Sequence, residues 1–171
     1  MAPGPTRIEK TGLAPHHFLY AIVGSPGMGK TSILTSLLCA SGEKSRLYRG
    51  CFDTIYFCCS ETSLRSIKSD PFSSIDSSQF YDEFNEDFLS EMRMKVEENS
   101  DKNEDTLIVI DDACNRLKSM TNEFCNLLLV HRHLRFSLIV LIYYFYIFYF
   151  LVTFRTPASG SQSITTFLLS L

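Results

Sequence analysis

The chain has 171 residues, of which 45% are hydrophobic and 20% charged, and its formal net charge is −3 at pH 7. This composition predicts one domain of ordinary size with a core and excludes a chain too polar to fold around one. The slightly acidic balance means that any nucleic-acid contact would need a local basic face.

The first fifteen or so residues are polar and rich in Pro and Gly, which predicts a flexible leader and no secretory signal peptide. The six cysteines show no zinc-binding spacing, so we expect reduced, mostly buried thiols in an intracellular protein.

A glycine-rich segment follows a predicted strand at residues 18–23 and precedes a predicted helix at residues 32–40. It fits the phosphate-loop pattern of Gly, four residues, Gly-Lys and then Ser or Thr: Gly24-Ser25-Pro26-Gly27-Met28-Gly29-Lys30-Thr31. Glycines bring backbone N–H groups close to phosphates, Lys30 reaches the β- and γ-phosphates, and the Thr31 hydroxyl suits Mg²⁺. Gly24 to Ser32 are therefore the predicted nucleotide-binding residues, with a glycine-rich turn that binds no ligand as the alternative.

The rest of the chain alternates strands and helices, which predicts a parallel α/β sheet. Further strands are expected at residues 52–59, 106–110 and 136–142, and helices at residues 80–96 and 117–130. Phe80, Phe84, Phe88 and Met92 recur every four residues in the first of these helices and are expected to pack in the core. The Ser-rich residues 60–78 and the charged residues 97–105 are predicted loops.

An acidic pair ends the strand predicted at residues 106–110. Four apolar residues followed by Asp111 and Asp112 form a Walker B segment, which carries a carboxylate to the edge of the sheet beside the phosphate loop. Asp111 is the predicted Mg²⁺ ligand, and Asp112 is predicted to orient or deprotonate the attacking water. The alternative for Asp112 is a helix N-cap.

A basic cluster, His131-Arg132-His133-Leu134-Arg135, precedes the strand predicted at residues 136–142. Arg132 is a candidate for contact with a γ-phosphate, in its own subunit or a neighbour's, or with DNA phosphates. A solvated loop is the alternative, and zinc is not expected because no third ligand lies near the two histidines.

Together these motifs resemble the virion DNA-packaging ATPases of poxviruses, related large DNA viruses and self-replicating transposons (Maverick or Polinton elements), within the FtsK–HerA branch of P-loop ATPases. The resemblance spans about residues 18–141 and rests on GSPGMGKT, FDTIYFCCS, LIVIDDA and a helix leading into HRHLRFSLIVL. The paired aspartates and Arg132-His133 are its most discriminating features.

The resemblance implies a P-loop NTPase, a three-layer αβα sandwich around a mainly parallel sheet. It also implies a homo-oligomeric ring that moves double-stranded DNA, with ATP and Mg²⁺ bound between subunits. Lys30, Asp112 and Arg132 would then be catalytic, and Thr31 and Asp111 would bind the metal. The expected location is intracellular, in the cytoplasm, the nucleus or a virus-assembly site.

The end of the chain departs from this family. Members usually carry a polar residue, often Gln, at the end of the fourth strand, where it senses the γ-phosphate, whereas this chain reads Leu141-Ile142-Tyr143-Tyr144. We expect a leader at residues 1–15, a P-loop core at 16–142, and an apolar segment and tail at 143–171, with the sheet incomplete and the C-terminus truncated or altered. This departure affects hydrolysis more than nucleotide binding.

Residues 136–154 carry no charge and are flanked by Arg132, Arg135 and Arg155, as a transmembrane span would be. A strand followed by an extra apolar segment is favoured, because a membrane span would leave the first and third predicted strands without a partner. Three hypotheses remain: an ATPase that moves DNA, a nucleotide-binding protein that has lost catalysis, and a membrane-anchored P-loop protein.

Overall fold

The computed structural model describes residues 13, 16–39, 48, 50–60, 76–111, 120–143 and 168–170. The elements follow in this order: β1 (Leu19–Gly24), α1 (Lys30–Cys39), β2 (Thr54–Cys58), the 3₁₀ helix η2 (Ser77–Gln79), β3 (Phe80–Tyr81), α3 (Glu86–Asp101), β4 (Thr106–Asp111), α5 (Thr121–Leu129), β5 (Phe136–Tyr143) and β6 (Leu168–Ser170). The four strands predicted from the sequence are all present, each within two residues of its expected ends.

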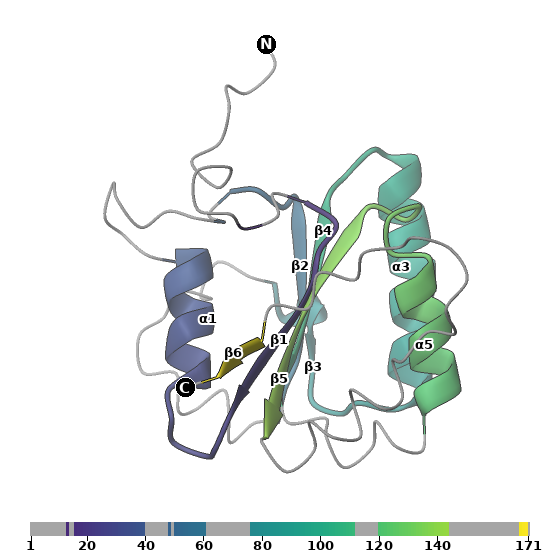
Figure 1. Cartoon of the computed structure of the whole chain (residues 1–171). Coiled ribbons are helices and arrows are strands. Elements are labelled where there is room, and N and C mark those ends of the chain that lie inside the picture. Colours follow the sequence, from purple (N-terminus) through teal and green to yellow (C-terminus); the bar gives the residue numbers. More distant parts are fainter. Residues whose placement is uncertain are drawn as a thin grey trace, which may run out of the picture.

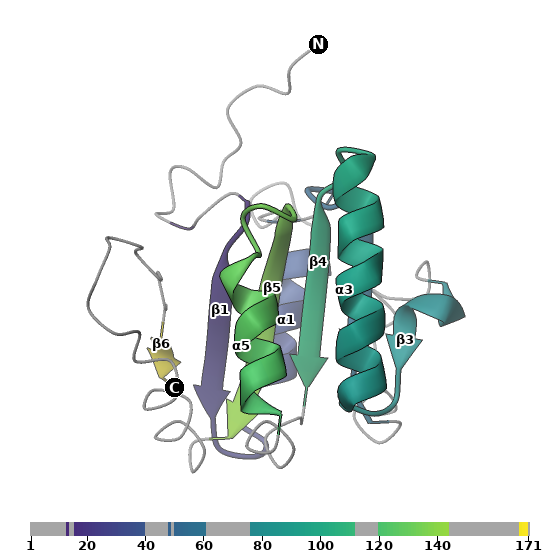
Figure 2. The same cartoon turned by 90° about the vertical axis from the view of Figure 1, so that its right-hand side faces the viewer.

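The strands form one parallel sheet in the order β3-β2-β4-β5-β1-β6. β5 lies between β1 and β4, as the strand interpretation of residues 136–142 requires, and Figure 2 shows these three strands side by side. The predicted parallel α/β fold is thereby confirmed. Because β1, β4 and β5 run in the same direction, their carboxyl ends meet at one edge, where ligands bind in such sheets.

Helices cover both faces of the sheet, with α1 on one side and α3 and α5 on the other (Figure 1). Phe57, Leu107 and Ile139 pack with Leu34 and Leu38 of α1. The residues that pack on the other face come from alternate strand positions and from the two helices: Ala21, Val23, Ile108, Ile110, Leu138, Val140, Phe88, Met92, Phe124 and Leu127. These two cores make the three-layer sandwich and explain why β5 is apolar at nearly every position and β4 is apolar between its two end residues.

The helix predicted at residues 80–96 begins and ends later than expected. Phe80 belongs to the short strand β3, and α3 starts after Asn85, whose side chain accepts a hydrogen bond from the Phe88 N–H over 2.8 Å. This cap satisfies a free N–H of the first turn, so it sets the start more strongly than the apolar spacing does. α3 continues to Asp101, through part of the predicted charged loop, and ends before Asn103, whose φ is 60°.

The predicted apolar stripe is confirmed for three of its four residues. Phe84, Phe88 and Met92 are buried in the core beneath α3. Phe80 instead stacks on Phe57 at the opposite face, with ring centres 5.5 Å apart. The four-residue spacing of Phe80 and Phe84 is therefore a coincidence, because these residues lie in β3 and in the connection before α3 rather than in the helix.

The first half of the apolar run at residues 136–154 is β5, in which Phe136 to Ile142 are all buried. A membrane helix over the whole run is therefore wrong, because these residues pair with β1 and β4 on either side. Among the described residues, no helix has both the length and the apolar character needed to cross a bilayer. Residues 168–170 of the predicted tail form β6, which pairs with β1 at Ala21, Ile22 and Val23.

Candidate phosphate-binding site

The glycine-rich segment leaves the carboxyl end of β1 and runs directly into α1. Gly27 and Gly29 have φ angles of 78° and 80°, in the region that glycine adopts most readily. The Met28 N–H donates to the Ser25 carbonyl over 3.3 Å, and the Ile33 N–H donates to the Gly29 carbonyl over 3.0 Å as the helix begins. A loop of this kind at a helix N-terminus is a setting for binding phosphate, because N–H groups and the helix dipole point at the same place.

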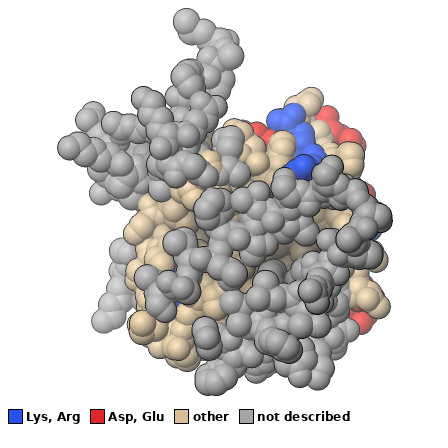
Figure 3. Space-filling model, in the orientation of Figure 1, with Lys and Arg blue, Asp and Glu red and all other residues tan. Residues whose placement is uncertain are grey.

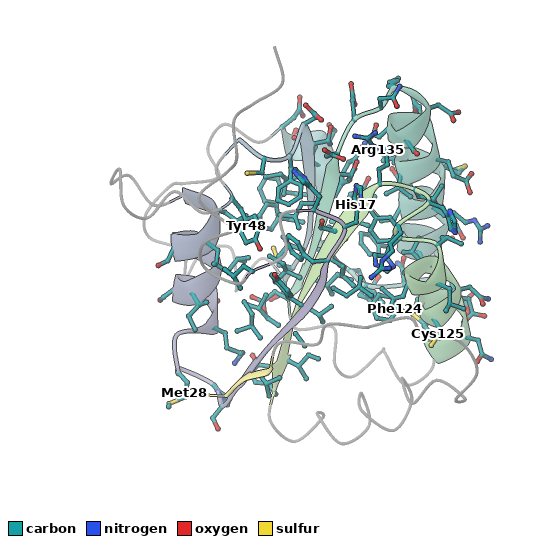
Figure 4. The ribbon with its side chains drawn as sticks, turned by 45° about the horizontal axis from the view of Figure 1, so that its top comes forward. His17, Met28, Tyr48, Phe124, Cys125 and Arg135 are labelled. Carbon is teal, nitrogen blue, oxygen red and sulfur yellow. The ribbon has the colours of Figure 1, made fainter. Side chains whose placement is uncertain are left out.

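The predicted binding residues differ in exposure. Gly24 and Lys30 are buried, Gly29 and Thr31 are half-buried, and the others are exposed: Ser25, Pro26, Gly27, Met28 and Ser32. Met28 extends outward at the tip of the loop (Figure 4), and half of it is exposed, 50%. The loop thus presents an open face to solvent, while its lysine is turned inward.

Lys30 is the first residue of α1, and its ammonium folds back onto the loop. Only 7% of the residue is exposed, which is rare for lysine. Its Nζ donates to the carbonyls of Gly24 and Ser25 over 3.0 and 3.1 Å and lies 4.3 Å from the centre of the Tyr143 ring. None of these described partners carries a formal charge. A phosphate anion that entered the loop would therefore give the ammonium a charged partner, which the described contacts do not provide.

Asp111 is the last residue of β4 and lies opposite Leu141 of β5, at the same edge of the sheet as the loop. Ile110, the residue before it, pairs with Cys58, so Asp111 lies beside the end of β2. Burial, and then the negative charge of Asp111, raise the pKa of the Cys59 thiol to about 12. Asp112 lies outside the described residues, so its role in hydrolysis stays a prediction.

The oxygen donors at this edge are suited to Mg²⁺. Thr31 offers a hydroxyl and Asp111 a carboxylate, both hard ligands of the kind that Mg²⁺ prefers. Within the described ranges, no group of three or more His, Cys, Asp or Glu side chains could hold a metal ion. An Mg²⁺ ion held by Thr31 and Asp111 would need further oxygen ligands, which nucleotide and water could supply, and it would neutralise phosphate charge.

Arg132 lies at the opposite end of the sheet from the loop. It precedes β5, whose first residue, Phe136, pairs with the first residue of β4, whereas Tyr143 at the other end pairs with Gly24. The strand between these ends spans about 23 Å at about 3.3 Å per residue. Figure 4 shows Arg135 and Met28 at opposite ends of the molecule. Contact between Arg132 and the γ-phosphate of its own subunit is therefore wrong; contact with a neighbour's site or with DNA stays a prediction.

Part of the basic cluster is engaged within the fold. Arg135 donates to Asp105 Oδ1 through Nε and Nη2 over 3.3 and 3.1 Å, and His17 Nε2 lies 3.2 Å from the same oxygen. Both His17 and Arg135 have a φ of 52°, so two strained residues converge on one carboxylate. Figure 3 shows basic atoms beside acidic ones along the upper edge of the molecule, so this described surface is mixed in charge.

Tyr143 is a site residue that the motifs do not single out. It ends β5, between β1 and β4, opposite Gly24, and its ring lies beneath Lys30. The resemblance of the motifs predicts a polar residue in this region. Tyr143 begins a run of aromatic residues, and the sequence does not distinguish it from the others. Its place at the site becomes clear only once the end of β5 is known.

The strand, glycine-rich loop and helix, set in a parallel sheet that carries an aspartate at the end of β4, define a P-loop NTPase. A family model described as Poxvirus A32 protein matches residues 6–170, so the chain belongs to the poxvirus A32 family of packaging ATPases that its motifs resemble. Membership gives the protein the general function of a viral DNA-packaging ATPase. A search of curated proteins finds no match.

Proposed function

We propose that the protein binds ATP with Mg²⁺ at Gly24 to Ser32 and hydrolyses it to move double-stranded DNA. The observation that carries the nucleotide site is the buried ammonium of Lys30, which is held inside a glycine-rich loop by two carbonyls and an aromatic ring. Burying a lysine beside neutral groups is costly, and phosphate oxygens would relieve that cost.

Each group then has a distinct role. The loop N–H groups and the N-terminus of α1 bind the phosphate chain, and Lys30 neutralises the β- and γ-phosphates. Thr31 and Asp111 hold the metal through their oxygens. Asp112, which follows β4 directly, orients the attacking water or accepts its proton.

The position of Arg132 supports a ring in which nucleotide lies between subunits. Its separation from its own loop leaves the loop of an adjacent subunit as the phosphate site that it can reach. In a head-to-tail ring, the amino end of one sheet would face the carboxyl end of the next, which brings Arg132 of one subunit to Lys30 of its neighbour.

The nucleotide site is tested by ATP binding and by phosphate release with and without double-stranded DNA. We expect DNA to stimulate release, Lys30→Ala to abolish binding and release, and Asp112→Asn to keep binding while it slows release about a hundred-fold. Lys102→Ala is a matched control, because that exposed lysine pairs with Glu98 over 2.8 Å on the surface of α3. Unchanged ATP binding in Lys30→Ala would refute the site.

The inter-subunit role of Arg132 is tested by mixing two inactive variants, Lys30→Ala and Arg132→Ala. A mixed ring contains interfaces with an intact lysine on one side and an intact arginine on the other, so activity should reappear on mixing. If Arg132→Ala alone retained full turnover and lost only DNA affinity, a contact with DNA phosphates would replace this role.

A nucleotide-binding protein that has lost catalysis is the second candidate, and Tyr143 is the observation that favours it. An aromatic ring stands at the end of β5, where the related ATPases carry a polar side chain that senses the γ-phosphate. ATP binding without turnover, with or without DNA, would establish this alternative. Turnover that Asp112→Asn removes would exclude it.

A further inference from the structure

We infer that Tyr143 is a positioning residue for Lys30, whose ammonium it holds until phosphate draws that ammonium away. The inference rests on the proposed nucleotide site and adds to it a residue that competes with the nucleotide. In the free protein, the ammonium of Lys30 would then contact an aromatic ring and two carbonyls of the protein itself, in place of phosphate oxygens.

The geometry of the contact supports a real cation–π interaction. The Lys30 Nζ lies 4.3 Å from the ring centre, inside the range of about 6 Å for such contacts. Only 7% of Lys30 is exposed, so solvent screens the attraction little. Tyr143 is half-buried and packs against the core beneath α3 and α5, which holds its ring in place.

The strand register explains why this residue meets the loop. Tyr143 pairs with Gly24, the last residue of β1, and the loop begins immediately after it. Lys30 is the first residue of α1, at the same edge of the sheet, so its side chain reaches the end of β5.

Lys95 provides an internal comparison. Its Nζ lies 5.3 and 5.8 Å from the ring centres of Tyr56 and Tyr81, and it pairs with Glu91 over 3.2 Å. That lysine has a carboxylate to balance its charge, and its rings are more distant. The described partners of Lys30 are two carbonyls and a closer ring, so the ring contributes more to holding it.

A contact that is made in the free protein and lost on binding lowers the apparent affinity for the ligand. If phosphate draws Lys30 from the ring, removing the ring should tighten nucleotide binding. A cation–π contact of ordinary strength corresponds to an increase in affinity of about two-fold to thirty-fold.

The first experiment is a titration of the full chain with a fluorescent ATP analogue. We expect Tyr143→Leu to bind more tightly by that factor, and Tyr143→Phe, which keeps the aromatic face, to stay within about two-fold of the unchanged protein. A trifluorinated phenylalanine at position 143 keeps the shape of the ring but weakens its attraction for cations, so it should behave like Tyr143→Leu. Weaker or unchanged binding in Tyr143→Leu and the fluorinated variant would overturn the inference.

A second measurement needs no nucleotide. Reductive methylation of the free protein, followed by peptide mass spectrometry, gives the rate at which Lys30 reacts relative to the exposed Lys102. We expect this ratio to rise at least about two-fold in Tyr143→Leu, and to stay unchanged in Tyr143→Phe, because loss of the ring frees the ammonium. An unchanged ratio in Tyr143→Leu would refute the contact.

The two measurements separate the possible failures. If the unchanged protein does not bind the analogue but methylation depends on the ring, the proposed nucleotide site fails while the contact stands. If it binds and Lys30→Ala abolishes binding, yet Tyr143→Leu changes neither affinity nor methylation, the site stands and the inference about Tyr143 fails.

Discussion

Ala substitutions at three glycines with positive φ can separate the effect of backbone strain on stability from the effect of a blocked phosphate loop on nucleotide affinity. Gly27, Gly29 and Gly50 have φ angles of 78°, 80° and 71°. Among the described residues, an added Cβ would meet nothing within 4 Å at Gly27 or Gly50, and at Gly29 it would meet only Ser32, at 3.9 Å. Replacement by Ala therefore produces no clash with the described part of the chain, and the structural cost is that of the left-handed backbone, about 1–2 kcal/mol.

We expect the free energy of unfolding to fall by about 1–2 kcal/mol in each Ala variant, or about 2–8 °C in thermal midpoint for a chain of this size. Gly27→Ala and Gly29→Ala should also lose nucleotide affinity by at least about ten-fold, because a side chain obstructs the approach of phosphate to the loop N–H groups. Gly50→Ala is the control. It carries the same strain near Tyr48, whose N–H bonds to Leu37 late in α1, away from the phosphate loop.

Circular dichroism gives the thermal midpoint, and titration with a fluorescent ATP analogue gives the affinity. The expected pattern is three similar losses of stability, with loss of affinity confined to the two loop variants. Equal loss of affinity in Gly50→Ala would show that binding merely follows stability. Full affinity in both loop variants would refute phosphate binding by this backbone.

Three further predictions concern the parts of the fold that support the site. Phe124→Ala should lower the free energy of unfolding by about 3–5 kcal/mol, since the ring is 1% exposed, whereas Leu129→Ala, at a residue 60% exposed, should change it by less than about 0.5 kcal/mol in urea unfolding. Asp105→Asn should cost about 1–2 kcal/mol by the same measurement, because Arg135 donates two hydrogen bonds to that partly exposed carboxylate. Burial lowers the pKa of His131 below its ordinary value of 6.5, although a hydrogen bond to a backbone carbonyl opposes the shift. The unfolded chain therefore binds more protons in acid, so stability should fall as the pH drops below about 6.5, and His131→Gln should reduce that dependence in thermal scans.

The sheet could be predicted from the sequence because local and tertiary preferences agree in its central strands. β5 is apolar at nearly every position and β4 is apolar between its two end residues, as strands covered on both faces are. The start of α3 could not be predicted from its spacing, because Phe80 and Phe84 continue the helical period before the helix begins. Asn85 caps the helix and so sets its first residue. The asparagine would have predicted this start only if its capping preference had been given more weight than the apolar spacing.

The candidate site was predictable where a motif fixes residues in consecutive positions. The backbone of the loop follows from its glycines, and Asp111 follows from a buried strand that ends at the correct edge of the sheet. Arg132 shows the limit of this reasoning. Its place before β5 is visible in the sequence, but the end of the sheet that it occupies depends on strand direction and on pairing with β4.

Tyr143 at the end of β5 and Arg132 just before its start bear on the mechanism together. The tyrosine ends β5 at the loop of its own subunit, whereas the arginine lies in the turn that leads into the other end of the strand. Because β5 is hydrogen-bonded to β1 and β4 along its length, it is among the most constrained strands of the sheet. In a head-to-tail ring, each phosphate site would then lie between the tyrosine end of one β5 and the arginine end of the next. A phosphate that draws Lys30 from Tyr143 would gain an arginine from the adjacent subunit, so binding and assembly would favour one another.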